Sequence, residues 1–180
     1  KKRYGDDILV EVELHLVSED EAVQKIKQLN NDNATHGIIV QLPLNDKSRT
    51  DELLDLVDPS KDVDALGKNA VYDPATPMAI NWLLAGCAVE LSHKKITLVG
   101  QGRLVGAPLA KMWQNSGYDV TVVDSSVRDL AKILKQSDVI VTATGVPGLI
   151  SSDMIKDGAA VIDAATASED GKIVGDLEPA

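Results

Sequence analysis

Three glycines in one short segment could bind a phosphate group. Gly100, Gly102 and Gly106 directly follow the apolar run ITLV and precede a stretch with helical spacing of apolar residues. Glycines let the backbone turn tightly and approach a pyrophosphate, and the N–H groups at a helix start favour negative charge. The spacing departs by one residue from G-x-G-x-x-G, so it also fits a glycine-rich turn without a ligand. The strand-then-helix context favours a dinucleotide-binding turn.

Two charged residues near this turn bear on the choice of cofactor. Asp124 ends the run VTVVD, where a carboxylate can accept hydrogen bonds from the ribose hydroxyls of NAD. Alternatively, it caps the next helix together with Ser125 or Ser126. Arg103 could contact a pyrophosphate or a 2′-phosphate, although a lone loop arginine is ordinarily a solvated charge. Asp124 favours NAD over NADP, and Arg103 opposes that choice.

A second group of polar residues lies nearer the start of the chain. Gln41 interrupts the apolar run GIIVQLPL, so its amide must find partners or face a cleft. Lys61, Asp62 and Asp64 follow Asp58 in a segment with much turn chemistry and little periodicity. By composition this is a solvated loop, yet loops of this length are often functional. The segment is therefore predicted to border a site.

Hydrophobic periodicity predicts the elements that would position these residues. For the first half, the pattern predicts strands over 8–17 and 37–44, helices over 18–32 and 50–58, and a loop over 59–77. An apolar helix over 79–91 would link two lobes. The second half then alternates strands and helices, which is typical of a parallel sheet with right-handed crossovers; its expected elements span 94–100, 103–117, 118–124, 127–137, 138–145 and 158–164.

Composition excludes several classes of function. A net charge of -10 disfavours binding to nucleic acid or to an anionic membrane surface. No apolar run approaches the roughly 20 residues of a membrane span. The single cysteine, Cys87, lies in an apolar run and predicts buried packing and a reducing, cytoplasmic compartment. The three histidines lack the spacing of paired ligands, so no metal site is predicted.

Several segments together resemble the methylenetetrahydrofolate dehydrogenase/cyclohydrolase family. The most specific are V-Q-L-P-L, D-P-x-K-D-V-D and the V-G-x-x-x-x-V-G-x-P turn; PATPMAI, TATGVPG and VIDAATASEDGKIVGDL follow the same order. The resemblance covers nearly the whole chain. It implies that a nicotinamide cofactor oxidises 5,10-methylenetetrahydrofolate, and that water then opens the methenyl product to 10-formyltetrahydrofolate in the same cleft. It also implies a homodimer.

The resemblance assigns roles to residues of both halves. Asp64 would hold the pterin, and Gln41 would hydrogen-bond a catalytic lysine. The best match to that lysine is Lys1, in the second half of a Y-x-x-x-K pattern whose tyrosine would precede the chain. Further substrate contacts fall on Leu42 and Pro43. The implied cofactor-binding residues are Thr76, Pro77, Gly100, Gln101, Gly102, Arg103, Gly106, Asp124, Ser125, Thr144, Gly145 and Thr166.

Two departures from the family pattern concern this site. Ala65 stands where the family usually has glycine, which predicts a modest change of loop shape. Asp124-Ser125 replaces a common His-Ser pair, and a carboxylate there would repel a 2′-phosphate. NAD is therefore the favoured cofactor, with NADP the alternative.

Together, these observations predict a two-lobed α/β enzyme with its active site in a cleft between the lobes. Residues 1–77 would form the folate-side lobe and residues 78–180 a Rossmann-type lobe. Two rival interpretations stay open. One is an NAD-dependent dehydrogenase of another small substrate, which would not respond to folates. The other is a non-catalytic dinucleotide-binding module, which would bind NAD without turnover.

Overall fold

The chain divides into two compact units. The computed structural model describes residues 1–169 and 171–179. The first unit runs from Lys1 to Tyr72 and the second from Asp73 to Ala180. The boundary expected between residues 77 and 78 lies inside helix α4 (Ala75–Gly86).

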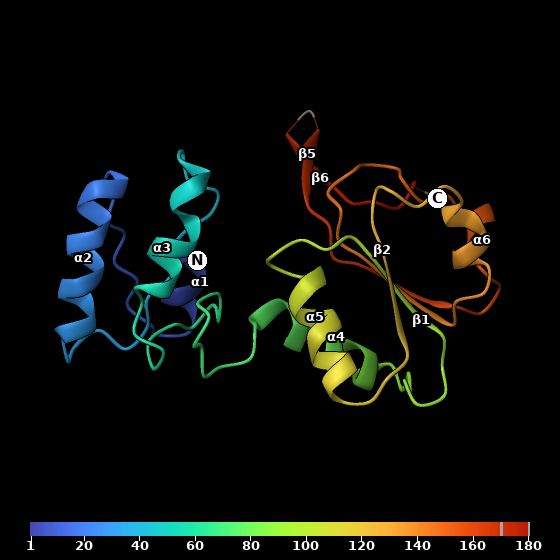
Figure 1. Ribbon diagram of the computed structural model, residues 1–180, viewed down its shortest axis with the longest axis horizontal. Helices are drawn as coiled ribbons and strands as arrows, with labels where there is room; N and C mark the ends of the chain where they lie inside the picture. The colour runs from blue at the N-terminus through green and yellow to red at the C-terminus, as the bar shows by residue number, and fades with distance from the viewer. Residues whose placement is uncertain (170, 180) are drawn as a thin grey trace. The chain divides into compact units, whose positions relative to one another are not determined.

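The first unit is built on short helices (Figure 1). They are α1 (Lys2–Asp7), α2 (Glu19–Asn31), the 3-10 helix η1 (Lys47–Arg49) and α3 (Thr50–Asp55). The sequence predicted α2 and its start. The Ser18 hydroxyl accepts the Glu21 N–H, and the Glu21 carboxylate accepts the Ser18 N–H, which satisfies two N–H groups at the helix end. The unit's core lies between α2 and α3 and consists of Ile26, Ile38, Leu53 and Val57.

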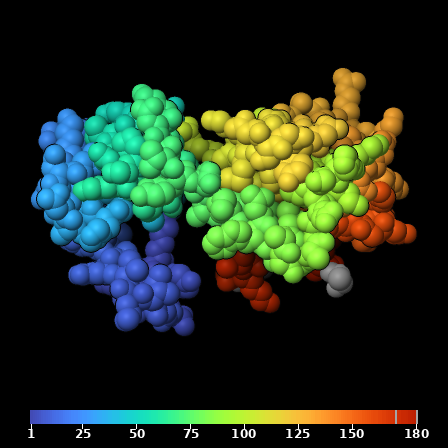
Figure 2. Space-filling model, turned by 90° about the horizontal axis from the view of Figure 1, so that it is seen from below, coloured from blue at the N-terminus to red at the C-terminus, as the bar shows by residue number. Residues whose placement is uncertain are grey.

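Two strands expected in this unit are not formed. Residues 8–17 are irregular, and most of their apolar side chains are exposed, Leu9 by 96% and Leu16 by 88%. Figure 2 shows the N-terminal residues (dark blue) protruding from the rest of their unit. Residues 37–44 make a single parallel bridge, between Ile38 and Asp62. Alternating apolar residues fit a sheet surface, but a strand also needs neighbours for its N–H and C=O groups. The described residues of this unit supply only that bridge.

The second unit contains the predicted parallel sheet. Its four strands are β1 (Ile96–Val99), β2 (Val120–Val123), β3 (Val139–Thr142) and β4 (Ala160–Asp163). They lie in the order β2-β1-β3-β4, and each neighbouring pair is parallel. β1 and β3 are buried along their whole length, as expected for central strands that are covered on both faces.

Helices cover both faces of this sheet (Figure 1). α4 and α5 (Gly106–Asn115) pack on one face, around the fully buried Trp113. The other face packs against α6 (Leu130–Leu134) and the segment around η2 (Ser152–Met154). An antiparallel hairpin of β5 (Ala167–Glu169) and β6 (Lys172–Val174) follows β4. The arrangement is the α/β fold that the sequence predicted.

Three local expectations need correction. α5 begins at Gly106, three residues later than expected, and α6 begins at Leu130 rather than near Val127. The Asp129 carboxylate caps α6 by accepting the Lys132 N–H. Cys87 is exposed at the C-terminal end of α4 and is not part of the core. Among the described residues, no helix is both long enough and apolar enough to cross a membrane.

Candidate functional site

The four parallel strands end together at one edge of their sheet. The register pairs Val99 with both Val123 and Thr142, and pairs Thr142 with Asp163. The loops that start at this edge carry most of the predicted cofactor-binding residues, namely Gly100, Gln101, Gly102, Arg103, Gly106, Asp124, Ser125, Thr144, Gly145 and Thr166. Ligands of open parallel sheets bind at the carboxyl ends of the strands. These residues therefore share the edge where a dinucleotide is expected.

The glycine turn requires glycine at two of its three positions. Gly100 has φ of 102°, and a Cβ there would lie 2.8 Å from the Ala143 carbonyl oxygen. At Gly106, a Cβ would lie 2.8 Å from the carbonyl carbon of Gly100 and closer still to its oxygen. The start of α5 thus touches the backbone at the end of β1. Gly102 has only one atom within 4 Å of such a Cβ, at 3.9 Å. Gly100 and Gly106 thus allow close packing of the protein's own backbone, which forms a tight strand-to-helix turn of the kind that binds phosphate at a helix start.

Asp124 lies at the predicted place, at the end of β2, and is exposed. Its Oδ1 accepts hydrogen bonds from the Ser126 N–H at 2.9 Å and from the Ser126 hydroxyl at 2.6 Å. These bonds lower the pKa of Asp124, the hydroxyl contributing more than the N–H. The carboxylate therefore shapes a turn and does not cap α6, whose cap is Asp129.

The other predicted cofactor residues differ in exposure. Gly145 has φ of 71° and is exposed, whereas Thr144 is half-buried and donates its N–H to the Asp176 carboxylate at 2.8 Å. Gln101, Arg103, Ser125 and Thr166 are exposed on their loops. Thr76 and Pro77 belong to the first turn of α4 in the second unit, where Thr76 is exposed and Pro77 is buried.

In the first unit, the three predicted catalytic residues come together. The Lys1 ammonium donates a hydrogen bond to Gln41 Oε1 at 3.1 Å and lies 3.7 Å from Asp64 Oδ2. Gln41 Nε2 donates to the carbonyl of Leu42 at 2.9 Å, which fixes the orientation of the amide toward Lys1. The Leu42–Pro43 peptide bond is cis. An exposed amine held between an amide oxygen and a carboxylate can exchange protons with a bound molecule.

The charged residues around Asp64 have different roles. Lys61 donates from Nζ to three carbonyl oxygens at and just beyond the C-terminal end of α2, those of Leu29, Asn30 and Asp32. Asp62 is buried and accepts the Gly67 N–H at 2.8 Å. Only Asp64 of this segment reaches Lys1. From the sequence alone, Lys61 and Asp62, which stabilise the fold, could not be distinguished from Asp64, the candidate site residue.

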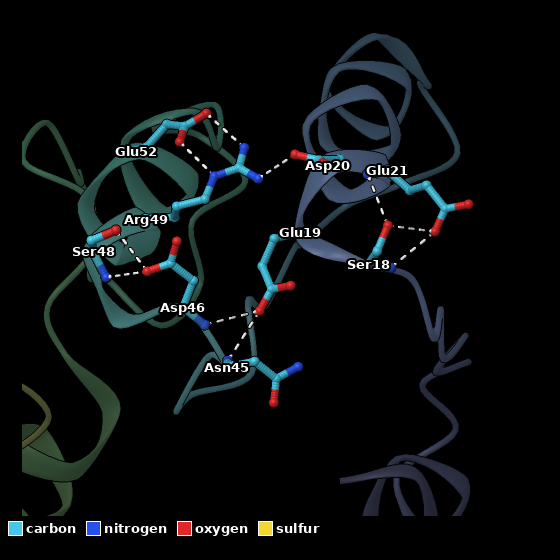
Figure 3. A network of polar contacts seen from close by, with 9 residues as sticks. All are labelled: Ser18, Glu19, Asp20, Glu21, Asn45, Asp46, Ser48, Arg49 and Glu52. Carbon is cyan, nitrogen blue, oxygen red and sulfur yellow. Dashed lines mark hydrogen bonds and ion pairs between the residues drawn. The ribbon is translucent and has the colours of Figure 1, made fainter.

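A polar network holds the chain that follows Pro43 (Figure 3). The Glu19 carboxylate, at the start of α2, accepts the N–H groups of Asn45 at 3.0 Å and Asp46 at 3.3 Å. Hydrogen bonds from backbone N–H groups, including that of Asp46, lower the pKa of Glu19. This carboxylate therefore anchors the segment just after the Gln41-Leu42-Pro43 turn. This role of Glu19 was not predicted from the sequence.

Arg49 adds a second link in the same network (Figure 3). Its guanidinium donates to both carboxylate oxygens of Glu52, at 2.9 and 3.1 Å, and to Asp20 at 2.6 Å. The bidentate bond to Glu52, followed by the bond to Asp20, raises the pKa of Arg49. Because Asp20 lies on α2 and Glu52 on α3, the arginine links these two helices.

Comparison with known families matches each unit to a model of its own. Residues 5–64 match the catalytic domain of tetrahydrofolate dehydrogenase/cyclohydrolase, and residues 74–180 match its NAD(P)-binding domain. The chain belongs to the tetrahydrofolate dehydrogenase/cyclohydrolase family. The catalytic-domain match contains Gln41 and Asp64, and the NAD(P)-binding match contains the glycine turn.

Individual members of the family align over nearly the whole chain. The bifunctional protein FolD of Staphylococcus carnosus is 35% identical, over 99% of this chain and 67% of its own length. The crystal structure of FolD from Campylobacter jejuni superposes with a TM-score of 0.91 at 33% identity, covering 98% of this chain and 68% of its own. FolD of Trypanosoma brucei, solved with NADP cofactor and an inhibitor, has a TM-score of 0.88 at 32% identity and the same coverage. The fold of the tetrahydrofolate dehydrogenase/cyclohydrolase family is thus the fold of this chain.

Proposed function

We propose that this chain oxidises 5,10-methylenetetrahydrofolate to the 5,10-methenyl form with NAD or NADP and then hydrolyses that product to 10-formyltetrahydrofolate. The observation that carries the proposal is the convergence of Lys1, Gln41 and Asp64 in the unit that matches the catalytic-domain model. In the unit that matches the NAD(P)-binding model, Gly100 and Gly106 stand where the turn has no room for a Cβ, and this turn supports the dehydrogenase step.

Lys1 is the proton-transfer group of this proposal. Hydrolysis of the methenyl compound needs a proton taken from the attacking water and a proton given to the ring nitrogen that leaves the former methenyl carbon. An amine can do both in turn, because it accepts a proton when neutral and donates one when charged. The Gln41 oxygen at 3.1 Å fixes where the amine points. An amide is suited to this task, since its own charge does not change with pH.

Asp64 and the Leu42-Pro43 turn bind the substrate. The Asp64 side chain is 29% exposed, so its carboxylate can accept hydrogen bonds from the donor-rich edge of a pterin while it stays near Lys1. Ala65, directly after it, has φ of 55°, a conformation that costs about 1–2 kcal/mol for a residue other than glycine. The loop therefore adopts at Ala65 a conformation that favours glycine, the residue usual in the family.

The dinucleotide is held at the carboxyl edge of the parallel sheet. When bound, a nicotinamide dinucleotide would supply the hydride acceptor for the oxidation. The turn from Gly100 to Gly106 fits the pyrophosphate, and Thr144, Gly145 and Thr166 lie on neighbouring loops of that edge. Thr76 and Pro77 would line the nicotinamide side. In this proposal, these residues bind and orient the cofactor, and the protons are moved by Lys1.

NAD is the preferred cofactor in this proposal. Ser126 occupies Oδ1 of Asp124, and the second oxygen of the exposed carboxylate can accept a ribose hydroxyl. A 2′-phosphate at that place would bring nearly two negative charges against the carboxylate. Arg103, exposed in the glycine turn, acts in the opposite direction, and an exposed ion pair contributes only about 0–1 kcal/mol.

We also propose a homodimer in the cytoplasm. The exposed apolar side chains between Ile8 and Val17, such as Leu9, Leu14 and Leu16, form a surface that a second copy could cover. A single cysteine in 180 residues fits a reducing compartment. Light scattering of the purified protein distinguishes the dimer from the monomer, and cell fractionation tests the compartment.

The deciding experiment follows both reactions with the whole chain. Purified protein is mixed with 5,10-methylenetetrahydrofolate and either dinucleotide, and the methenyl compound is supplied separately to measure hydrolysis. We expect turnover in both assays. Oxidation of another small substrate without a response to folates would indicate a different dehydrogenase. Dinucleotide binding without any turnover would indicate a non-catalytic module.

A further inference from the structure

Asp176 is a fully buried carboxylate beside the proposed cofactor site. It has no exposed surface, and its oxygens accept three hydrogen bonds from one stretch of chain. Oδ2 accepts the Thr142 hydroxyl and, at 2.8 Å, the Thr144 N–H, whereas Oδ1 accepts the Val146 N–H at 2.9 Å. Burial of a carboxylate is costly unless such donors surround it. Asp176 thus organises the loop that leaves β3.

The chain around Asp176 is itself fixed on both sides. The Ile150 N–H donates to the Asp176 carbonyl, and the Glu178 N–H donates to the Ile150 carbonyl, each at 3.0 Å. Asp163, at the end of β4, accepts the Leu177 N–H at 3.0 Å. A Cβ at Gly175 would lie 2.6 Å from the carboxyl carbon of Asp163, so a larger residue there would displace the Asp163 side chain that accepts the Leu177 N–H. The Asp176 carboxylate is therefore held in place before any ligand binds.

The loop that Asp176 organises contacts the glycine turn. The backbone of Gly100 packs against Ala143 and Thr144, where a Cβ would lie 2.8 Å from the Ala143 oxygen and 3.2 Å from Thr144 Cγ2. The N–H groups of Thr144 and Val146 point to Asp176, and the Val146 N–H also reaches the Thr144 hydroxyl oxygen at 3.1 Å. The polar groups of the loop that can meet a ligand therefore include the Gly145 N–H, the loop carbonyls and the proton of the Thr144 hydroxyl. If this loop moved, the polar groups that it offers to a ligand would move, and so would the backbone of Ala143 and Thr144 against which Gly100 packs.

We infer that Asp176 is a positioning residue for the dinucleotide. It acts through the loop over residues 143–146 and does not touch the cofactor. The inference rests on the proposed function, because it needs a dinucleotide at the carboxyl edge of the sheet. It assigns to Asp176 a role in cofactor affinity rather than in the chemistry of the folate, which depends on Lys1, Gln41 and Asp64 in the other unit.

The principal test is Asp176→Asn. One of the two oxygens becomes an NH2 group, so whichever way the amide lies, at least one donor of the loop faces another donor. We expect the KM for NAD or NADP to rise about tenfold or more, with little change in the KM for 5,10-methylenetetrahydrofolate. Hydrolysis of the methenyl compound uses no dinucleotide and should keep its wild-type rate. Thermal unfolding of the variant checks separately that the second unit, which contains Asp176, stays folded.

A matched control lies at the other end of β3. Asp138 accepts hydrogen bonds from the Lys95 N–H and from Lys156 Nζ, yet it lies at the amino edge of the sheet. Asp138→Asn removes a partly exposed carboxylate that is likewise bonded to the sheet, and should leave the KM for the dinucleotide within about twofold, since its partners do not reach the proposed cofactor loops. A tenfold rise in that KM for Asp138→Asn would mean that any lost carboxylate weakens the site, and would overturn the inference.

A second pair of variants covers the case in which Asp176→Asn does not fold. Thr142→Ser keeps the hydroxyl that donates to Asp176, whereas Thr142→Val removes it at nearly constant shape. We expect the serine variant to bind the dinucleotide as the wild type does and the valine variant about threefold more weakly. Equal affinities in these two variants, or a wild-type KM in Asp176→Asn, would overturn the inference. If the wild type itself binds neither NAD nor NADP, the proposed function fails, and the role of Asp176 fails with it.

Discussion

The close approach of α5 to β1 predicts that Gly106 cannot be replaced, even by alanine. The added Cβ would lie 2.8 Å from the carbonyl carbon of Gly100, closer still to its oxygen, and 3.2 Å from Cα of Gln101. All three neighbours are backbone atoms, so no side chain can rotate away. Since favourable contact begins near 3.5 Å, the start of α5 must move from β1 by roughly 1 Å.

The cost of that movement can be bounded. Overpacking of a well-packed site typically costs about 1–3 kcal/mol, and a backbone neighbour places Gly106→Ala toward the upper end. Alanine recovers about 0.4–1 kcal/mol, because it restricts the unfolded chain. The net loss is therefore about 2 kcal/mol, which corresponds to a fall in Tm of about 4–8 °C for a chain of this size. A shift of about 1 Å can also lower the efficiency of a site about 100-fold.

The assay compares Gly106→Ala with Gly102→Ala in the same turn. Thermal unfolding gives the stability, and titration with NAD and NADP gives the affinity. A Cβ at Gly102 would meet only the Ala143 oxygen, at 3.9 Å, so the stability of this control should stay within about 0.5 kcal/mol of wild type. Wild-type affinity in Gly106→Ala, or an equal loss in both variants, would refute the view that close backbone approach is what the third glycine provides.

Three further predictions concern the proposed roles. Asp64→Ala should abolish tetrahydrofolate binding and leave NAD affinity nearly unchanged, as titration calorimetry with each ligand would measure; retained folate binding would rule out the pterin role. Lys1→Met should remove hydrolysis of the methenyl compound more completely than cofactor binding, because an apolar side chain cannot transfer protons, and Lys2→Met is its matched control; a wild-type rate in Lys1→Met would exclude this lysine. Asp124→Ser should shift the ratio of kcat/KM for NAD and NADP toward NADP, by about three- to tenfold for an exposed charge. Because Ser126 lowers the pKa of Asp124, the wild-type preference for NAD should persist at mildly acidic pH, and a wild type that prefers NADP would contradict the assignment.

The second unit could be predicted well because its strands supply the hydrogen-bond partners that each of them needs. β1 and β3 are buried runs of apolar residues with one threonine each, and their hydrogen-bond partners lie within about 45 residues in the same unit. Glycine positions also carried strong information, since positive φ or close approach at Gly100 and Gly106 leaves no alternative residue. The fold class and the place of the glycine turn followed from these local features.

The first unit was harder to predict because its apolar patterns indicate which side chains share a face but not which segment pairs with that face. Residues 8–17 alternate like a strand, yet no described strand pairs with them. The grouping of Lys1 with Gln41 and Asp64 joins positions 40 and 63 residues apart, which no spacing rule connects, so it came from the family resemblance alone. The role of Asp176 was not predicted for the same reason: the groups that donate hydrogen bonds to it lie some 30 residues earlier in the chain.

The segment D-P-S-K-D-V-D shows why charge and spacing were insufficient. Asp62 and Asp64 are two residues apart, and in a regular strand they would point to the same side. A turn intervenes, however, in which the Ala65 N–H donates to the Asp62 carbonyl at 3.2 Å and Ala65 takes a positive φ. The turn leaves Asp62 buried against the Gly67 N–H and brings Asp64 to Lys1. Two identical side chains thus become a structural anchor and a proposed site residue because of one backbone conformation, and the usual signal for that conformation, a glycine, is absent from position 65.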